Sequence, residues 1–201
     1  MKLLKALEKI LPLIFWLFLI FAFDTPRLAL LTIFAAVIHE AGHIAFGLSR
    51  GIVRLIPSPH PSGFRIKAEK TLSYKDEIIL LLGGPVLNFI FFFIAVFLSK
   101  LLTKGSFFDF AFINLLTALS NLLPIKGYDG YRILENLFLL KGSESFKLVK
   151  ILSWVSFLFT SLLCFLSLYL VLKLGEGYWI FALFFSSALV GVKKITETGV
   201  F

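Results

Sequence analysis

The chain has 201 residues, of which 59% are hydrophobic and only 16% are charged, and its mean hydropathy is +0.95. Soluble domains carry about 25% charged residues, so this composition excludes an ordinary soluble protein and predicts a polytopic membrane protein. The formal charge of +8 does not indicate nucleic-acid binding, because an excess of Lys and Arg in membrane proteins more often reports topology.

Six apolar segments predict transmembrane helices. Several are shorter than the roughly 20 residues that cross the hydrocarbon core, so the first and last would gain length from flanking lysines whose charged ends extend toward water. The predicted spans, in chain order, are 10–23, 28–48, 78–98, 107–124, 151–172 and 178–192. We therefore expect an all-α polytopic membrane protein that forms a single domain over residues 1–201.

Charge indicates the orientation of these helices. With six spans, sixteen of the 20 Lys and Arg residues lie on the side of both termini, and four (Arg27, Lys100, Lys104 and Lys173) lie on the other. Basic residues are retained in cytoplasmic loops, so we expect both termini in the cytoplasm.

The loop between the second and third spans predicts a short β-hairpin at the cytoplasmic membrane face. Ile52–Ile56 and Phe64–Ala68 have the composition of extended segments. The proline-rich stretch Pro57–Gly63 joins them and would not be tolerated in a helix.

The pentapeptide His39-Glu40-Ala41-Gly42-His43 lies within the second predicted span. On a helix, HExxH places two imidazoles one turn apart on one face, where both can bind zinc while the glutamate acts as a general base. Ionisable side chains are costly at membrane depth, so this cluster indicates a functional site. We predict His39 and His43 as ligands of Zn²⁺ and Glu40 as the catalytic base.

Catalytic zinc usually has three protein ligands and a water, so HExxH needs a further ligand. Asp129 is favoured, because the span 107–124 covers only about 25 Å before Pro124 ends it, which would leave the following chain near the depth of the histidines. His60, in the proline-rich stretch, is better interpreted as an exposed loop histidine. The alternative for Asp129-Gly130 is a plain turn, since Asp-Gly is a common turn pair.

Two amide side chains also lie in predicted spans: Asn88, which follows Gly83-Gly84-Pro85, and Asn121. In one interpretation the Gly-Gly-Pro sequence breaks its helix, and the amides bind the substrate peptide or stabilise an oxyanion. In the other, the proline kinks the helix and each Asn forms a hydrogen bond between helices. The two interpretations stay open on chemistry alone.

The order and spacing of three motifs resemble the site-2 protease family of intramembrane zinc metalloproteases. The motifs are His39–His43, Gly83–Asn88, and Asn121–Pro124 with Asp129-Gly130. The short architecture is most similar to the bacterial branch that includes a sporulation protease. The resemblance implies that His39, His43 and Asp129 bind zinc, that Glu40 activates water, and that Asn88 and Asn121 lie near the substrate. It also implies that the hairpin can pair with an extended peptide.

We therefore expect an intramembrane zinc metalloprotease of the bacterial cytoplasmic membrane that cleaves a membrane-spanning substrate protein, under the control of a regulatory membrane partner. A second enzyme hypothesis is a membrane zinc protease whose third ligand is Glu135 or Glu144. The non-enzyme alternatives are a metal-binding transporter and a scaffold that holds membrane segments without cutting them.

Overall fold

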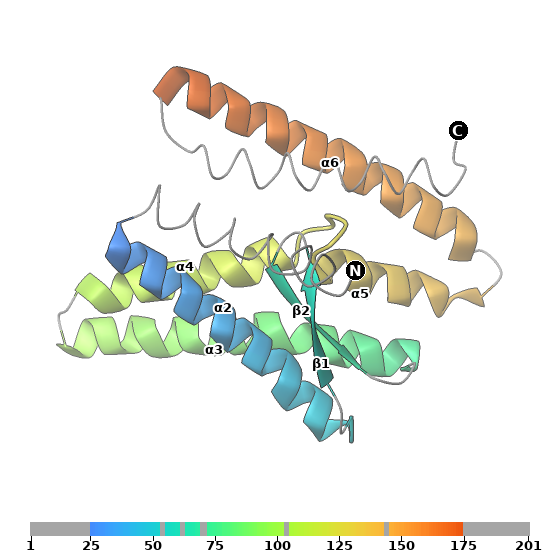
Figure 1. Cartoon of the computed structure of the whole chain (residues 1–201), viewed down its shortest axis with the longest axis horizontal. Coiled ribbons are helices and arrows are strands. Elements are labelled where there is room, and N and C mark those ends of the chain that lie inside the picture. Colours follow the sequence, from blue (N-terminus) through green and yellow to red (C-terminus); the bar gives the residue numbers. More distant parts are fainter. Residues whose placement is uncertain are drawn as a thin grey trace, which may run out of the picture.

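The structure, a computed structural model, describes residues 25–52, 55–60, 63–68, 72–102, 105–142 and 145–174. Its elements are α2 (Pro26–Ser49), β1 (Leu55–His60), β2 (Gly63–Ala68), α3 (Tyr74–Leu102), α4 (Gly105–Asn121), α5 (Asp129–Leu139) and α6 (Ser145–Leu174) (Figure 1). The predicted spans 10–23 and 178–192 lie outside the described residues. The spans 28–48, 78–98 and 151–172 each fall within a longer helix.

Three of these helices, α2, α3 and α6, are long and apolar enough to cross a membrane. The helix α4 is apolar but shorter, and it ends at Asn121 rather than at the predicted residue 124. The cause is Pro124, which has no N–H to donate and also disfavours the helical conformation of the residue before it.

The helices α2, α3 and α4 pack against one another, and α5 packs against α3 and α6 (Figure 1). The backbones of α2 and α3 touch at Gly42 and Gly83, where a Cβ atom on Gly42 would lie 2.2 Å from the Gly83 carbonyl oxygen. Small residues at such crossings are typical of membrane helices, because lipid gives little hydrophobic drive for association and close packing takes its place.

Large apolar side chains cover the outside of the helices. Phe93 and Phe97 on α3 are each 65% exposed, and Phe146 and Phe165 on α6 are 83% and 72% exposed. An exposed apolar surface of this extent would be unstable in water but suits contact with lipid. The long apolar helices and this surface together support an integral membrane protein.

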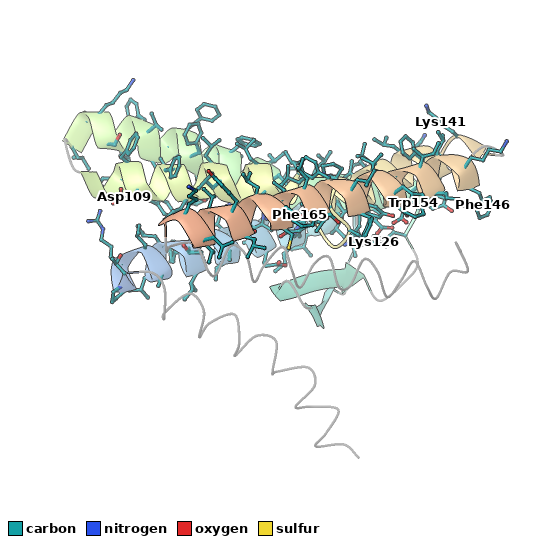
Figure 2. The ribbon with its side chains drawn as sticks, turned by 90° about the horizontal axis from the view of Figure 1, so that it is seen from above. Asp109, Lys126, Lys141, Phe146, Trp154 and Phe165 are labelled. Atoms are coloured by element: carbon teal, nitrogen blue, oxygen red, sulfur yellow. The ribbon has the colours of Figure 1, made fainter. Side chains whose placement is uncertain are left out.

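Ion pairs hold α2 at both of its ends. Near its start, Arg27 pairs with Asp109 of α4, and at its end Arg50 Nη2 lies 2.8 Å from Asp76 Oδ1 of α3. Figure 2 places Asp109 near one end of the helices and Lys141 near the opposite end. Exposed pairs of this kind contribute at most about 1 kcal/mol. They join the two ends of α2 to α4 and to α3.

The loop after α2 contains two antiparallel strands, β1 and β2, which agree with the predicted hairpin in place but not in boundaries. The first strand includes Pro57 and Pro59, which were expected in the turn, and it pairs Leu55 with Ala68 and His60 with Gly63. Residues two apart direct their backbone N–H positions toward the same edge. Both prolines can therefore face the unpaired edge of a two-stranded sheet, where no donor is needed.

The amphipathic helix α5 was not predicted, since residues 129–139 were assigned to a loop. Its polar residues keep it below the hydropathy of a membrane span, so a search for apolar runs misses it. It buries Asp129, Gly130, Tyr131 and Asn136. The Tyr131 hydroxyl lies 2.9 Å from Ser153 Oγ of α6, and Arg132 Nη2 lies 2.5 Å from Glu77 Oε1 of α3. These contacts hold the start of α5 beside α3.

Candidate metal centre

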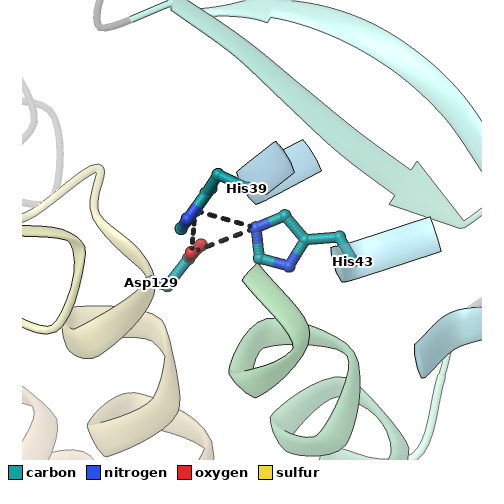
Figure 3. Close-up of side chains that lie close together, drawn as sticks. All are labelled: His39, His43 and Asp129. Atoms are coloured by element: carbon teal, nitrogen blue, oxygen red, sulfur yellow. Dashed lines mark hydrogen bonds and ion pairs between the residues drawn. The ribbon is translucent and has the colours of Figure 1, made fainter. Parts of the chain in front are cut away.

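Three of the predicted site residues meet between the packed helices (Figure 3). His39 and His43 come from successive turns of α2, and Asp129 is the first residue of α5. Asp129 Oδ2 lies 3.0 Å from His39 Nε2 and 3.1 Å from His43 Nε2, and the two Nε2 atoms are 3.2 Å apart. All three residues are buried, with exposed fractions of 5%, 6% and 8%. The cluster therefore joins residues 90 positions apart in one small, buried site.

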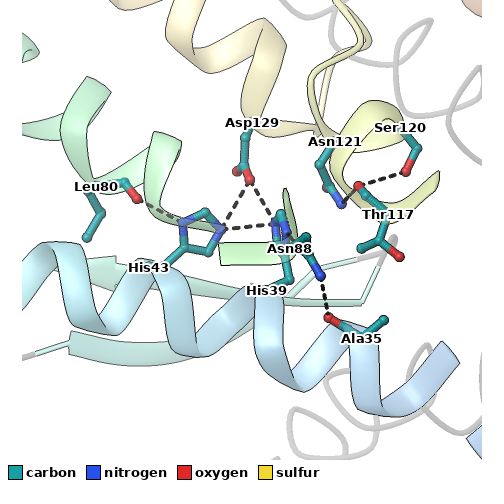
Figure 4. Close-up of polar contacts among 9 residues, drawn as sticks. All are labelled: Ala35, His39, His43, Leu80, Asn88, Thr117, Ser120, Asn121 and Asp129. Carbon is teal, nitrogen blue, oxygen red and sulfur yellow. Dashed lines mark hydrogen bonds and ion pairs between the residues drawn. The ribbon is translucent and has the colours of Figure 1, made fainter. Parts of the chain in front are cut away.

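The other ring nitrogen of each histidine contacts an acceptor (Figure 4). His39 Nδ1 lies 2.7 Å from Asn88 Oδ1, and His43 Nδ1 lies 2.9 Å from the Leu80 carbonyl oxygen. Because these oxygens accept, each Nδ1 must carry the proton and donate it. The two Nε2 atoms are then left with lone pairs directed toward Asp129, which is the tautomer of a metal-ligating histidine.

Positive charge between these three atoms would stabilise the cluster. The two Nε2 lone pairs and the Asp129 carboxylate oxygen face one another at 3.0–3.2 Å, and a cation between them would remove their mutual repulsion. For an ion such as zinc, bonds of about 2.0–2.2 Å in tetrahedral geometry separate the ligand atoms by roughly 3.3–3.6 Å. The observed separations of 3.0–3.2 Å are close to this range. The donor set therefore fits a divalent metal ion.

A glycine leaves room beside the ligand atoms. A Cβ atom on Gly84 of α3 would lie 2.6 Å from His39 Nε2 and 2.7 Å from His43 Nε2. Any side chain at this position would fill the space next to both nitrogens. The absence of a side chain at residue 84 therefore creates the cradle that an ion at these ligands needs.

Glu40 occupies the position between the two histidines on α2 and is half-buried. Its carboxylate is close enough to interact electrostatically with His43. This position is compatible with the predicted general base.

The two predicted substrate residues have different surroundings (Figure 4). Asn88 is 0% exposed, and besides accepting from His39 it donates through Nδ2 to the Ala35 carbonyl oxygen and to Asn114 Oδ1. Its polar atoms are thus committed to protein groups. The Asn121 Nδ2 atom donates to the Thr117 carbonyl oxygen of its own helix at 2.9 Å, and its side chain is half-buried. Contact of either amide with a substrate stays a prediction.

The geometry around Gly83-Gly84-Pro85 also resolves the question of the helix break. The helix α3 runs without interruption from Tyr74 to Leu102 and contains Pro85 in its interior. For Asn88, the arrangement is the interhelical hydrogen bond of the second interpretation. Sequence reasoning missed Asn114, although an amide within the predicted span 107–124 is the same signal that singled out Asn88.

Gly130 sets the position of Asp129. A Cβ atom on Gly130 would lie 2.1 Å from the Leu122 carbonyl oxygen, so the first turn of α5 packs directly on the chain that follows α4. We expect Gly130→Ala to push Asp129 away from the histidines and to weaken metal binding by about 10–100-fold, the effect typical of lost support around a ligand. Competition with a chromogenic chelator would measure it. Gly142→Ala is the control, because that position is strained at φ +78° but meets nothing within 4 Å. Equal losses in both variants would contradict the assignment.

A search of solved structures relates this arrangement to a known protein. The site-2 protease from Methanocaldococcus jannaschii matches with a TM-score of 0.63, over 92% of this chain and 86% of that chain, at 21% sequence identity. The chain has the site-2 protease fold. No protein-family model and no curated protein matches the chain.

The site-2 protease fold agrees with the resemblance found in the motifs, and the sporulation-type branch stays a prediction. In the described part of the chain, the group of potential metal ligands consists of His39, His43 and Asp129 and does not contain Glu135. Glu144, the other candidate of the second enzyme hypothesis, lies outside the described residues.

Proposed function

We propose that the chain is a member of the site-2 protease family, an intramembrane zinc metalloprotease that hydrolyses a peptide bond in or near a transmembrane segment of its substrate. The observation that carries this proposal is the convergence of His39, His43 and Asp129 at 3.0–3.2 Å in the interior of the helices. HExxH and the shared fold support it. A transporter or scaffold would not require a glutamate between the two ligands.

The ligands would be Nε2 of both histidines and the Asp129 carboxylate. Zinc bound there would polarise the scissile carbonyl and lower the pKa of a water molecule. Glu40 would accept a proton from the attacking water and pass it to the leaving amine. The burial of the cluster excludes bulk water, which strengthens each of these electrostatic interactions.

The substrate would be another membrane-spanning protein. A peptide bond within a helix is shielded by its own hydrogen bonds, so the substrate must become extended before attack. The strands β1 and β2 offer an edge at which an extended segment could pair. Asn121, whose side chain is half-buried, is a candidate to contact that segment. We place the reaction toward the cytoplasmic side, with both termini in the cytoplasm, on the basis of the charge distribution.

Replacement of Glu40 by Gln tests the proposed function. We expect Glu40→Gln to reduce cleavage by about 10²–10⁴-fold, because it removes the base but keeps the size of the side chain. Quantitative proteomics of membranes that carry the native chain or this variant would reveal full-length substrates that accumulate, and purified protein would then cleave them directly.

The matched control is Glu135→Gln, a change of the same chemistry on α5, outside the ligand cluster. Its cleavage should equal that of the native chain. Full cleavage by purified Glu40→Gln would exclude the hydrolytic mechanism.

A further inference from the structure

A series of buried amides connects α4 to the ligand His39. Asn114 on α4 donates through Nδ2 to the Phe110 carbonyl oxygen at 2.9 Å and accepts through Oδ1 from Asn88 Nδ2 at 2.8 Å. Asn88 in turn accepts from His39 Nδ1 at 2.7 Å. Both amides are 0% exposed. The helices α4, α3 and α2 thus contribute to one chain of hydrogen bonds that ends at the His39 ring.

Backbone carbonyls determine the orientation of both amides. A carbonyl oxygen can only accept, so the Phe110 oxygen requires Asn114 Nδ2 on its side and directs Oδ1 toward Asn88. The Ala35 carbonyl oxygen, 3.0 Å from Asn88 Nδ2, acts on Asn88 in the same way. Asn88 Nδ2 therefore faces two acceptors, and Oδ1 is the atom that faces His39.

The opposite orientation of Asn88 would interfere with metal binding. An Nδ2 atom facing His39 would donate to Nδ1 and move the ring proton to Nε2. That proton would point at Asp129 Oδ2, 3.0 Å away, and form a stable hydrogen bond without a metal. Asn114 Oδ1 opposes this state. If Asn88 rotated, its Oδ1 atom would face Asn114 Oδ1, and the two acceptors would have no proton between them.

We propose that Asn114 is a positioning residue for the metal centre, which acts through the Asn88 amide to keep the Nε2 lone pair of His39 directed at the ion. The inference rests on the proposed metal site, to which it adds a residue on a third helix that touches neither the ion nor a ligand. Partners of this type fix the tautomer and orientation of metal-bound histidines.

Zinc affinity of the full-length chain, measured by chelator competition, tests the proposal. Asn114→Leu keeps the approximate volume but removes the acceptor, and we expect a loss of about 10–100-fold. Asn114→Asp should restore most of the affinity. Burial favours its neutral carboxyl group, which can donate to the Phe110 carbonyl oxygen and accept from Asn88.

The control for a general loosening of the helices is Asp109→Asn, which weakens the ion pair between α2 and α4 without changing any group that takes part in the hydrogen bonds of the amides. It should leave zinc affinity within about twofold of the parent. Nitrogen-15 NMR of the metal-free chain adds a direct readout, because the chain has only three histidines. His39 should be protonated at Nδ1 in the parent, and Asn114→Leu should shift the proton toward Nε2.

The proposal is wrong if Asn114→Leu binds zinc as tightly as the parent, or if Asp109→Asn loses as much affinity. It is also wrong if Asn114→Asp fails to restore binding while its thermal unfolding matches the parent. His39→Ala distinguishes a failure of the proposed metal site from a failure of the role proposed for Asn114. Retention of zinc by that variant would refute the metal site itself, whereas its loss together with tight binding by Asn114→Leu would refute only the role of Asn114.

Discussion

Asp129→Ala should lower zinc affinity by at least about 100-fold, whereas Glu135→Ala should leave it unchanged. Asp129 supplies the one negatively charged atom of the cluster, 3.0 Å and 3.1 Å from the two Nε2 atoms. Without it, the ion would have only two neutral ligands and no negatively charged ligand in a buried site. Loss of a residue that hydrogen-bonds to a metal ligand already lowers metal affinity by about 10–100-fold, so loss of a ligand should lower it further.

The measurement is the metal content of purified protein after dialysis against a graded series of chelator concentrations. Glu135 is a matched control because it lies on the same helix, less than two turns after Asp129, and outside the ligand group. Zinc loss in Glu135→Ala with retention in Asp129→Ala would favour the protease type whose third ligand is a glutamate. Retention of zinc by both variants would show that neither of these α5 residues is a zinc ligand.

Gly84→Ala should also abolish metal binding, although it adds only a methyl group. The new Cβ atom would lie 2.6 Å from Cε1 and Nε2 of His39 and 2.7 Å from His43 Nε2, closer than atoms in contact can approach. The rings are held from behind by Asn88 and the Leu80 carbonyl oxygen, so they cannot retreat without losing a hydrogen bond. We expect a loss of at least about 100-fold in zinc affinity and no detectable cleavage.

The fold should survive this substitution. All three nearest atoms around residue 84 belong to side chains, and alanine is more favourable than glycine within a helix by about 0.5–1 kcal/mol. Gly83→Ala provides the contrast, because its Cβ would lie 2.4 Å from the Gly42 carbonyl oxygen, which is backbone. That variant should lower the unfolding temperature by separating α2 from α3. A Gly84→Ala protein that unfolds as early as Gly83→Ala would show that residue 84 serves helix packing and not the metal.

The residues of the candidate site were predictable to the extent that their chemistry is local. HExxH combines two ligands and a base within five residues of one helix, and the common face of the two histidines follows from helical geometry alone. Asp129 was found by a less direct route, from an early helix end at Pro124 that would leave the following chain near the depth of the histidines. The structure reaches the same ligand through α5, a helix that the apolar pattern did not reveal.

The supporting residues were harder to predict, since their roles depend on neighbours distant in sequence. Asn88 was open to two interpretations, because an amide in a membrane helix can serve a substrate or a neighbouring helix equally well. Its three hydrogen bonds go to α2 and α4, and no pattern within α3 specifies those partners. For the same reason the Gly83-Gly84-Pro85 sequence suggested a helix break that α3 does not have, and it did not reveal that Gly84 leaves space beside two imidazoles.

Composition and helical periodicity are properties of contiguous residues, so they are enough to predict a membrane protein with HExxH inside an apolar helix. The contacts that hold Asp129 at the histidines, the tautomer of each histidine and the groups behind each ring are visible only in the packed helices. These features depend on how α2, α3, α4 and α5 are packed. The close backbone contact of small residues such as Gly42 and Gly83 helps to set that packing.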